Sequence, residues 1–125
     1  YYAEEAWTWE LQALTRARPV AGDAALSVRI MSAVRAVLTH ARDNAKILAE
    51  VAGMRARMER ERRARSVWDL KLAPGGFVDI EFIAQALQLT HASRAPDVLA
   101  ANTGEAIERL SAHGALSDEA CERLV

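Results

Sequence analysis

Apolar residues recur along this chain at spacings of three and four positions, and this pattern restricts its fold more than any other feature. One series runs through Leu26, Ile30, Ala33 and Val37, and a second through Ile47, Val51, Met54 and Met58. An α-helix makes one turn in 3.6 residues, so each series lies on one helical face. The pattern predicts an all-α fold in which helices bury these faces against one another.

Turn and capping residues divide the chain into about five helices of an up-and-down bundle. Pro19 disfavours helix at the residue before it, so the first helix should end near Arg18. The side chains expected to cap later helices are Asp23, Asp43 or Asn44, Asn102 in a capping box with Glu105, and Ser117. Gly114 should end the helix that Asn102 begins. We expect the second and third helices to be antiparallel neighbours.

Residues 67–76 interrupt the helical pattern. Val67 to Leu72 alternate between apolar and polar side chains, which is typical of a strand or an extended loop. Pro74, Gly75 and Gly76 then predict a turn and the start of a helix over residues 77–91. Apolar side chains cover more than one face of that helix, so we expect it at the centre of the core.

The turn before this helix carries the residues most suited to binding chemistry. Gly75 and Gly76 would let the backbone approach a ligand, and free N–H groups in the first helical turn attract anions. Lys71 could add a charge toward a phosphate. Asp79 and Glu81 would suit a metal-bound phosphate, a cation or an arginine partner. A structural interpretation stays open, in which the glycines form the turn and the carboxylates serve the helix dipole or pair with arginines.

Two other patterns have both a functional and a structural interpretation. The polar stripe of Glu81, Gln85, Gln88 and His91 must face water, a cleft or buried hydrogen-bond partners. The arginine run over residues 55–65 is either a surface for an acidic partner or a solvated face. On a solvated face, Glu59 would pair with Arg63 and Glu61 with Arg65, in each case four positions on.

The first helix and the tryptophans allow similar alternatives. Arg16 and Arg18 could bind a phosphate or carboxylate, or complement the dipole at a helix C-terminus. Trp7, Trp9 and Trp68 are expected to be core or interface anchors.

Composition narrows the classes of partner. The net charge of −1 argues neither for nor against nucleic acid, but aromatic residues do not interleave the arginine run as they do in single-strand binding platforms. Cys121 is the only cysteine, which excludes an internal disulfide and a thiolate metal cluster. Apolar runs fall short of the ~20 residues that span a bilayer. We expect a cytoplasmic protein without nucleic-acid or membrane partners.

Several segments resemble the glutamine synthetase adenylyltransferase family. Residues 1–23, with Glu-Ala-Trp-Thr-Trp-Glu at 5–10, are similar to the start of the helical region in its C-terminal, adenylylating half. Residues 54–58 and 71–82 resemble two further family segments, and residues 85–89 continue the latter. Ala73 and Val78 depart from the family pattern, in which glycine and arginine are common. These departures weaken the inference that the loop contacts a phosphate directly.

The resemblance implies an enzyme that transfers AMP from ATP to a tyrosine of glutamine synthetase and responds to the PII signal protein and glutamine. The family's catalytic domain holds Mg²⁺ through an Asp-x-Asp pair after a Gly-Ser turn, and neither motif occurs in residues 1–125. We therefore expect a single helical domain, a piece of a longer protein that follows a nucleotidyltransferase domain. We expect it to carry no catalytic residue or metal ligand and to be inactive alone.

The resemblance also implies a site. Six residues are expected at the edge of the nucleotide cleft: Arg18, Lys71, Gly75, Gly76, Asp79 and Glu81. Two alternatives stay open. One is the related helical region of the PII uridylyltransferase, although the Trp-Thr-Trp run favours the adenylyltransferase. The other is a non-catalytic module that docks glutamine synthetase or a regulator.

Overall fold

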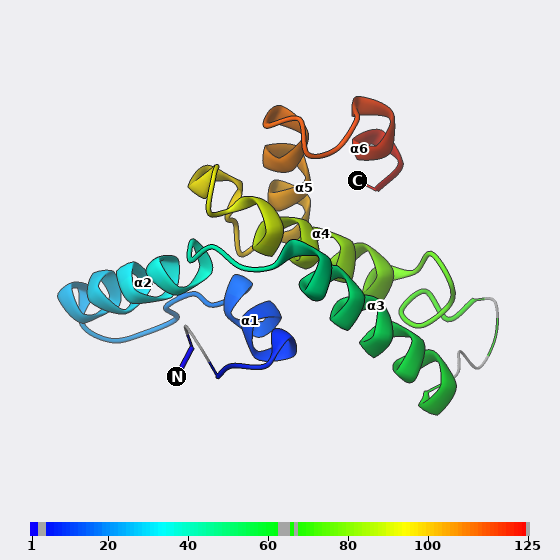
Figure 1. Ribbon diagram of the computed structural model, residues 1–125, viewed down its shortest axis with the longest axis horizontal. Coiled ribbons are helices and arrows are strands. Elements are labelled where there is room, and N and C mark those ends of the chain that lie inside the picture. Colours follow the sequence, from blue (N-terminus) through cyan, green and yellow to red (C-terminus); the bar gives the residue numbers. More distant parts are fainter. Residues whose placement is uncertain (3–4, 63–65, 67, 125) are drawn as a thin grey trace.

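The computed structural model describes residues 1–2, 5–62, 66 and 68–124, and within them it has six α-helices and one 3-10 helix. In chain order these are α1 (Thr8–Thr15), α2 (Ala24–Leu38), α3 (Asn44–Glu61), α4 (Phe77–His91), η1 (Pro96–Val98), α5 (Thr103–Ala112) and α6 (Asp118–Leu124) (Figure 1). The all-α prediction is confirmed. None of the described helices is long and apolar enough to cross a bilayer.

Side-chain caps begin four of these helices as the sequence predicts. Asp23, Asp43, Asn102 and Ser117 each accept a hydrogen bond from the backbone N–H three residues later, at 2.8–3.2 Å. These bonds satisfy N–H groups that have no partner within the helix. The Glu105 half of the predicted capping box is wrong, because its carboxylate accepts instead from Arg109 at 2.6 Å.

Helix α5 ends where Gly114 predicts. This glycine has a φ of +71°, in the left-handed region that L side chains disfavour. Its N–H donates to the Ser111 carbonyl at 2.8 Å, and the Ala115 N–H donates to the Leu110 carbonyl at 2.9 Å. The two bonds form a Schellman motif, which turns the chain toward α6.

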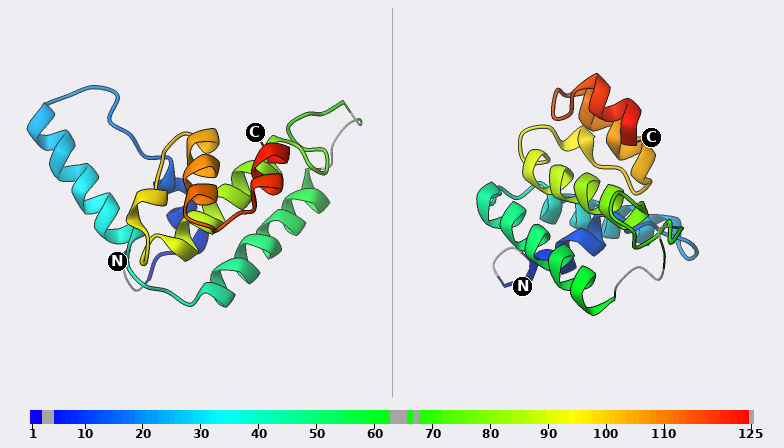
Figure 2. Two further views of the ribbon diagram at one scale, coloured as in Figure 1. Left: turned by 90° about the horizontal axis from the view of Figure 1, so that it is seen from above. Right: turned by 90° about the vertical axis from the view of Figure 1, so that its right-hand side faces the viewer.

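Helix α4 is central, as predicted, and α1, α3 and α5 all pack against it (Figure 2). Its residues contribute to two buried clusters. The first consists of Leu11, Leu38, Ile47, Val51, Ala86 and Leu89. The second, between the end of α4, η1 and α5, consists of Ala92, Val98 and Leu110. The core therefore lies on both sides of α4.

Helix α2 diverges from α3 at the joint formed by residues 39–43, and the two helices form a V (Figure 2). The prediction of an antiparallel pair is therefore wrong. The packed part of α2 is its C-terminal end, where Leu38 is buried and Val37 packs against the core. The guanidinium of Arg42 donates to the carbonyls of Val37 (2.8 Å) and His40 (2.9 Å), which fixes the joint.

Helix α1 ends at Thr15 and not near Arg18. The Arg16 and Ala17 N–H groups donate to carbonyls three residues back, at 3.2 and 3.0 Å, so the last turn tightens and stops. The Thr15 hydroxyl donates to the Gln12 carbonyl at 2.7 Å, which reinforces this end.

Residues 68–76 form successive turns, and Val67 lies outside the described residues. Of the two predictions for this segment, the irregular loop is therefore correct for residues 68–76, and the strand is wrong there. The Asp69 carboxylate accepts from the N–H groups of Lys71 (3.3 Å) and Leu72 (3.1 Å). Its backbone carbonyl accepts from the Ala73 N–H at 2.9 Å. These local bonds use the groups that a strand would need.

The three tryptophans are exposed, by 70% at Trp7, 54% at Trp9 and 82% at Trp68. The sequence predicts that they anchor either the core or an interface, and the prediction of a place in the core is wrong. Each indole instead places apolar surface on the outside of the molecule.

Candidate functional site

The turn before α4 is built from a close backbone approach. Gly75 has a φ of +78°. A Cβ at Gly76 would lie 2.6 Å from the Leu70 carbonyl oxygen and 2.8 Å from that of Ala73. Both glycines are therefore required for the turn, as the structural interpretation predicts.

Loop carbonyls occupy the first N–H groups of α4. Phe77 donates to the Leu70 carbonyl at 2.9 Å, and Val78 donates to the Lys71 carbonyl at 3.2 Å. These are two of the groups that a helix N-terminus would offer to an anion. The predicted anion site of free N–H groups is therefore wrong for these two residues.

Asp79 connects the loop, α3 and α4. One carboxylate oxygen accepts from the Arg55 guanidinium, and the other accepts from the Gly75 N–H at 2.6 Å. Both partners of the ion pair are largely buried, with 16% of the Arg55 side chain and 23% of the Asp79 side chain exposed. Partial burial favours the neutral acid, but the bonds from Arg55 and Gly75 outweigh it and lower the pKa of Asp79 below its ordinary value.

The role of Arg55 was not predicted from the sequence, in which this residue belongs to a basic run. Arg55 also reaches the Leu72 carbonyl at 3.5 Å, so one side chain holds α3 to the loop and to α4. Its hydrogen bond to Asp79 raises its own pKa. A signal was present, because Arg55 follows Val51 by four positions and therefore lies on the apolar face of α3. The predicted pairs to Arg63 and Arg65 lie outside the described residues.

Glu81 faces a different side of α4. Two positions along a helix correspond to a rotation of about 200°, so Asp79 and Glu81 point to different neighbours. Glu81 accepts from Arg16, the residue that follows α1, at 2.5 Å. Arg18 lies beyond the end of α1 and is exposed, as is Lys71 in the loop. The structure therefore brings Lys71, Gly75, Gly76 and Asp79 together, with Glu81 and Arg18 on the α1 side.

The polar stripe on α4 continues into the core. Gln85 and Gln88 are 8% and 2% exposed. The Gln12 amide of α1 donates to Gln85 Oε1 at 3.0 Å, and the Ala100 N–H donates to Gln88 Oε1 at 2.9 Å. Of the three interpretations of this stripe, buried hydrogen-bond partners are correct for these two residues.

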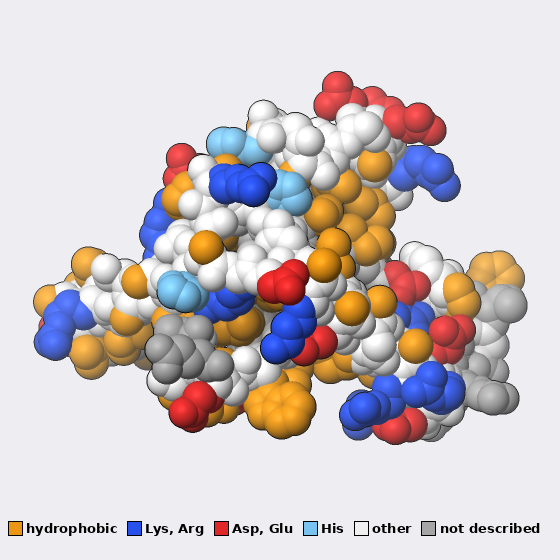
Figure 3. Space-filling view, viewed as in Figure 1, with side chains coloured by type: hydrophobic (Ala, Val, Ile, Leu, Met, Phe, Trp, Pro, Cys, Tyr) orange, Lys and Arg blue, Asp and Glu red, His pale blue; other side chains and the backbone are white. Residues whose placement is uncertain are grey.

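An apolar groove of about 510 Å³ lies between α3 and α4, next to the Arg55–Asp79 pair. Its walls include Leu48, Phe82 and Ile83. On the face shown in Figure 3, apolar side chains also gather between α4 and α6. The groove suits an apolar side chain or ring. Among the described residues, no group of three or more His, Cys, Asp or Glu side chains could hold a metal ion.

Comparison with known proteins gives two family matches. Residues 44–125 match the family described as GlnD PII-uridylyltransferase, and residues 1–33 match the one described as Glutamate-ammonia ligase adenylyltransferase. The "Bifunctional glutamine synthetase adenylyltransferase/adenylyl-removing enzyme" of Rhodopseudomonas palustris (strain TIE-1) is 48% identical over 124 residues, covering 99% of this chain and 12% of that protein.

The enzyme of the same name from Caulobacter vibrioides is 50% identical over 125 residues, covering 99% of this chain and 13% of that protein. The chain belongs to the glutamine synthetase adenylyltransferase family. It spans about 12% of the length of the relatives it matches. The adenylyltransferase match ends inside α2, and the GlnD match begins at Asn44, the first residue of α3.

Proposed function

We propose that this chain is a helical support region of a cytoplasmic enzyme that transfers AMP from ATP to a tyrosine of glutamine synthetase and so regulates nitrogen assimilation. The observation that carries the proposal is 48% identity over 99% of the chain to a relative named for this activity. Glutamine synthetase is then the protein substrate, and the PII signal protein is a regulator. The GlnD-type match over residues 44–125 is consistent with a PII-linked pathway.

Asp79 and Glu81 do not fit the Mg²⁺ that the reaction requires, and no other group of three or more His, Cys, Asp or Glu side chains in the described part of the chain could hold a metal ion. Asp79 and Glu81 each pair with an arginine, and they face different neighbours across α4. Two carboxylates must converge on one point to hold a metal ion between phosphates. We therefore assign ATP and Mg²⁺ to a nucleotidyltransferase domain upstream in the same polypeptide.

The contribution of this chain is to shape one edge of the nucleotide cleft. Gly75, Gly76 and Asp79 fix the loop through the bonds described above. Lys71, carried by that loop, is exposed and able to approach a phosphate. Glu81 orients the end of α1 through Arg16, two residues before Arg18. In this arrangement Lys71 and Arg18 are the residues that contact nucleotide, and the others position them.

Kinetics of the full-length enzyme test this proposal. Lys71→Ala should raise the KM for ATP about tenfold, because a charge-assisted contact to phosphate is lost. The matched control is Lys46→Ala, the other lysine, which lies on α3 and pairs with Glu50 at 3.9 Å. The control should leave the KM for ATP unchanged. Equal KM values for the two variants would contradict a nucleotide contact from this loop.

A docking module that binds glutamine synthetase and touches no nucleotide is the second candidate. The apolar groove between α3 and α4 favours it, because Ile83 in its wall is 40% exposed. This function predicts that Ile83→Ser raises the KM for glutamine synthetase while Lys71→Ala leaves the KM for ATP unchanged. The two functions therefore give opposite results in the same assay.

A further inference from the structure

The apolar stripe of α2 is covered at one end and uncovered at the other. Leu26, Ile30 and Val37 fall within about 40° of one another around the helix axis. Val37 packs against the core at the C-terminal end. On the same stripe, Leu26 is 50% exposed and Ile30 is 52% exposed. The uncovered part therefore continues an interface that already exists within the molecule.

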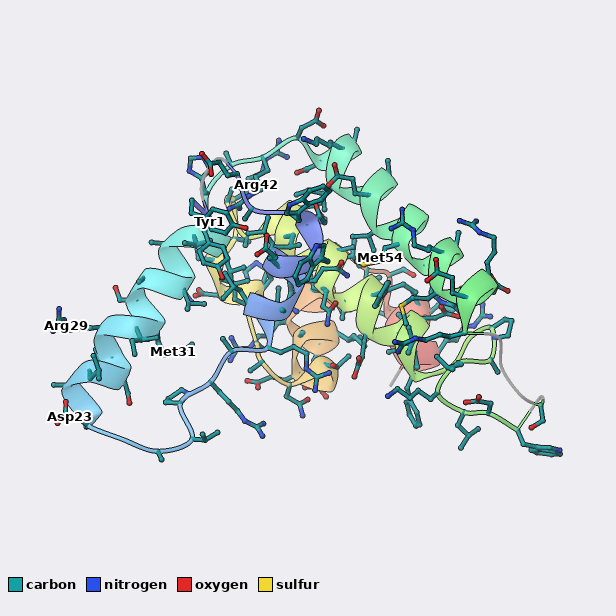
Figure 4. The ribbon with its side chains drawn as sticks, turned by 90° about the horizontal axis from the view of Figure 1, so that it is seen from below. Tyr1, Asp23, Arg29, Met31, Arg42 and Met54 are labelled. Carbon is teal, nitrogen blue, oxygen red and sulfur yellow. The ribbon has the colours of Figure 1, made fainter. Side chains whose placement is uncertain are left out.

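This uncovered part projects from the molecule. In Figure 4, Asp23 lies at the tip of α2, Arg29 points away from the rest of the molecule, and Met31 points toward it. Met31 lines a groove of about 230 Å³ with Leu14 and Leu99. Residues 24–33 form nearly three turns of helix whose packing within the described chain is slight. Because short isolated helices are marginal in water, this length of helix requires a packing partner.

The family matches indicate which partner that is. The match to the adenylyltransferase family ends at residue 33, so it includes the uncovered turns of α2 and stops where the packed turns begin. The chain is 12% of the relative's length, so most of that polypeptide is available to cover the stripe. We propose that the Leu26–Ile30 face of α2 docks onto the adenylyltransferase domain of the same polypeptide. This inference rests on the proposed function, since it takes the chain as a piece of the longer enzyme.

Thiol labelling of the full-length enzyme tests the docking. Single substitutions Leu26→Cys and Ile30→Cys place a thiol on the stripe, and Val28→Cys is the matched control. Val28 is 70% exposed and lies about 160° around the helix from Leu26. With labelling followed by mass spectrometry of the α2 peptide, thiols at 26 and 30 should react about tenfold more slowly than the thiol at 28. In urea the three rates should become equal.

Three results would overturn the docking. One is equal rates at all three positions in the folded enzyme. A second is protection that grows with enzyme concentration, which would assign the face to a second copy. A third is protection that develops after addition of glutamine synthetase, which would assign the face to the substrate. An assay of adenylyl transfer on the same preparations separates the docking proposal from the proposed function. Slow labelling at positions 26 and 30 without adenylyl transfer would contradict the proposed function and leave the docking intact.

Discussion

At the scale of single residues, the site depends on one largely buried ion pair. Asp79 accepts from Arg55 of α3 and from the Gly75 N–H, and Arg55 also reaches the loop carbonyl of Leu72. Charge-assisted bonds of this kind are about twice as strong as neutral ones. The conformation of the loop that carries Lys71 therefore depends on a contact between α3 and α4.

Removing the charge of Asp79 should destabilise the fold. Asp79→Asn leaves Arg55 without its ionic partner in a largely buried position, and we expect the free energy of unfolding to fall by about 1.5–3 kcal/mol. The matched control is Asp97→Asn, whose ion pair with Arg35 is exposed by 81% and 49%. That change should cost less than about 0.5 kcal/mol. Urea denaturation measures both, and equal losses would contradict the importance of the buried pair.

The pH dependence of the same variant gives a second readout. The pKa of Asp79 is lowered in the folded state, so folding favours its ionised form. The stabilisation is complete above the unfolded pKa and is lost as the pH falls through the folded pKa. The difference in unfolding free energy between wild type and Asp79→Asn should be constant from about pH 7 to 5 and shrink below about pH 4. A difference that stays constant down to pH 3 would contradict the assignment.

The two glycines at 53 and 76 should respond oppositely to alanine. Gly76→Ala places a Cβ 2.6 Å from the Leu70 carbonyl oxygen, and the forced shift should cost about 1–3 kcal/mol. A Cβ at Gly53, within α3, would meet no atom within 4 Å, so Gly53→Ala should stabilise the fold by about 0.5–1 kcal/mol. Thermal unfolding measures the sign of each change. Destabilisation by both would contradict the account of the turn.

At the scale of elements, buried amides determine how α1, α4 and the segment before α5 fit together. Gln85 bonds to Gln12 across the α1–α4 contact, and Gln88 bonds to the Ala100 N–H. One Gln12 amide atom, Oε1, has no partner among the described residues. The α1–α4 interface therefore buries one amide oxygen that has no hydrogen bond among the described residues. It should be sensitive to loss of the bond between Gln12 and Gln85.

Removing the Gln85 amide alone should lower the free energy of unfolding more than removing the Gln12 and Gln85 amides together. Gln85→Leu leaves the Gln12 amide buried without its hydrogen bond, at a cost of about 1–3 kcal/mol. Adding Gln12→Leu removes the unpaired amide, so the double variant should be more stable than Gln85→Leu. A double-mutant cycle by urea denaturation measures this coupling. Additive losses would show that the two amides do not act as a pair.

The starts of the helices could be predicted from sequence, whereas their partners could not. The side chains of Asp23, Asp43 and Asn102 cap their helices by accepting from the backbone N–H three residues later. Such local contacts can be predicted from the sequence. Arg55 and Asp79 are separated by 24 positions, so their contact depends on how α3 packs on α4. Periodicity identifies the apolar face of a helix but not what covers it. For this reason the direction of α2 could not be predicted.

At the scale of the whole molecule, the helices form two parts with different surroundings. Helices α3 and α5 and the 3-10 helix η1 pack against α4, and α6 packs against α5, all within the GlnD-type match. Helix α2 belongs largely to the adenylyltransferase-type match and projects from this core. This projection of α2 is the observation from which we propose docking of its Leu26–Ile30 face.

We propose that this chain supports adenylyl transfer and does not perform it. The most direct test is transfer of label from ATP to glutamine synthetase, with residues 1–125 compared with the full-length enzyme under the same conditions. We predict that the full-length enzyme labels glutamine synthetase and that residues 1–125 do not. Labelling by residues 1–125 alone would place the chemistry within this chain and contradict the account.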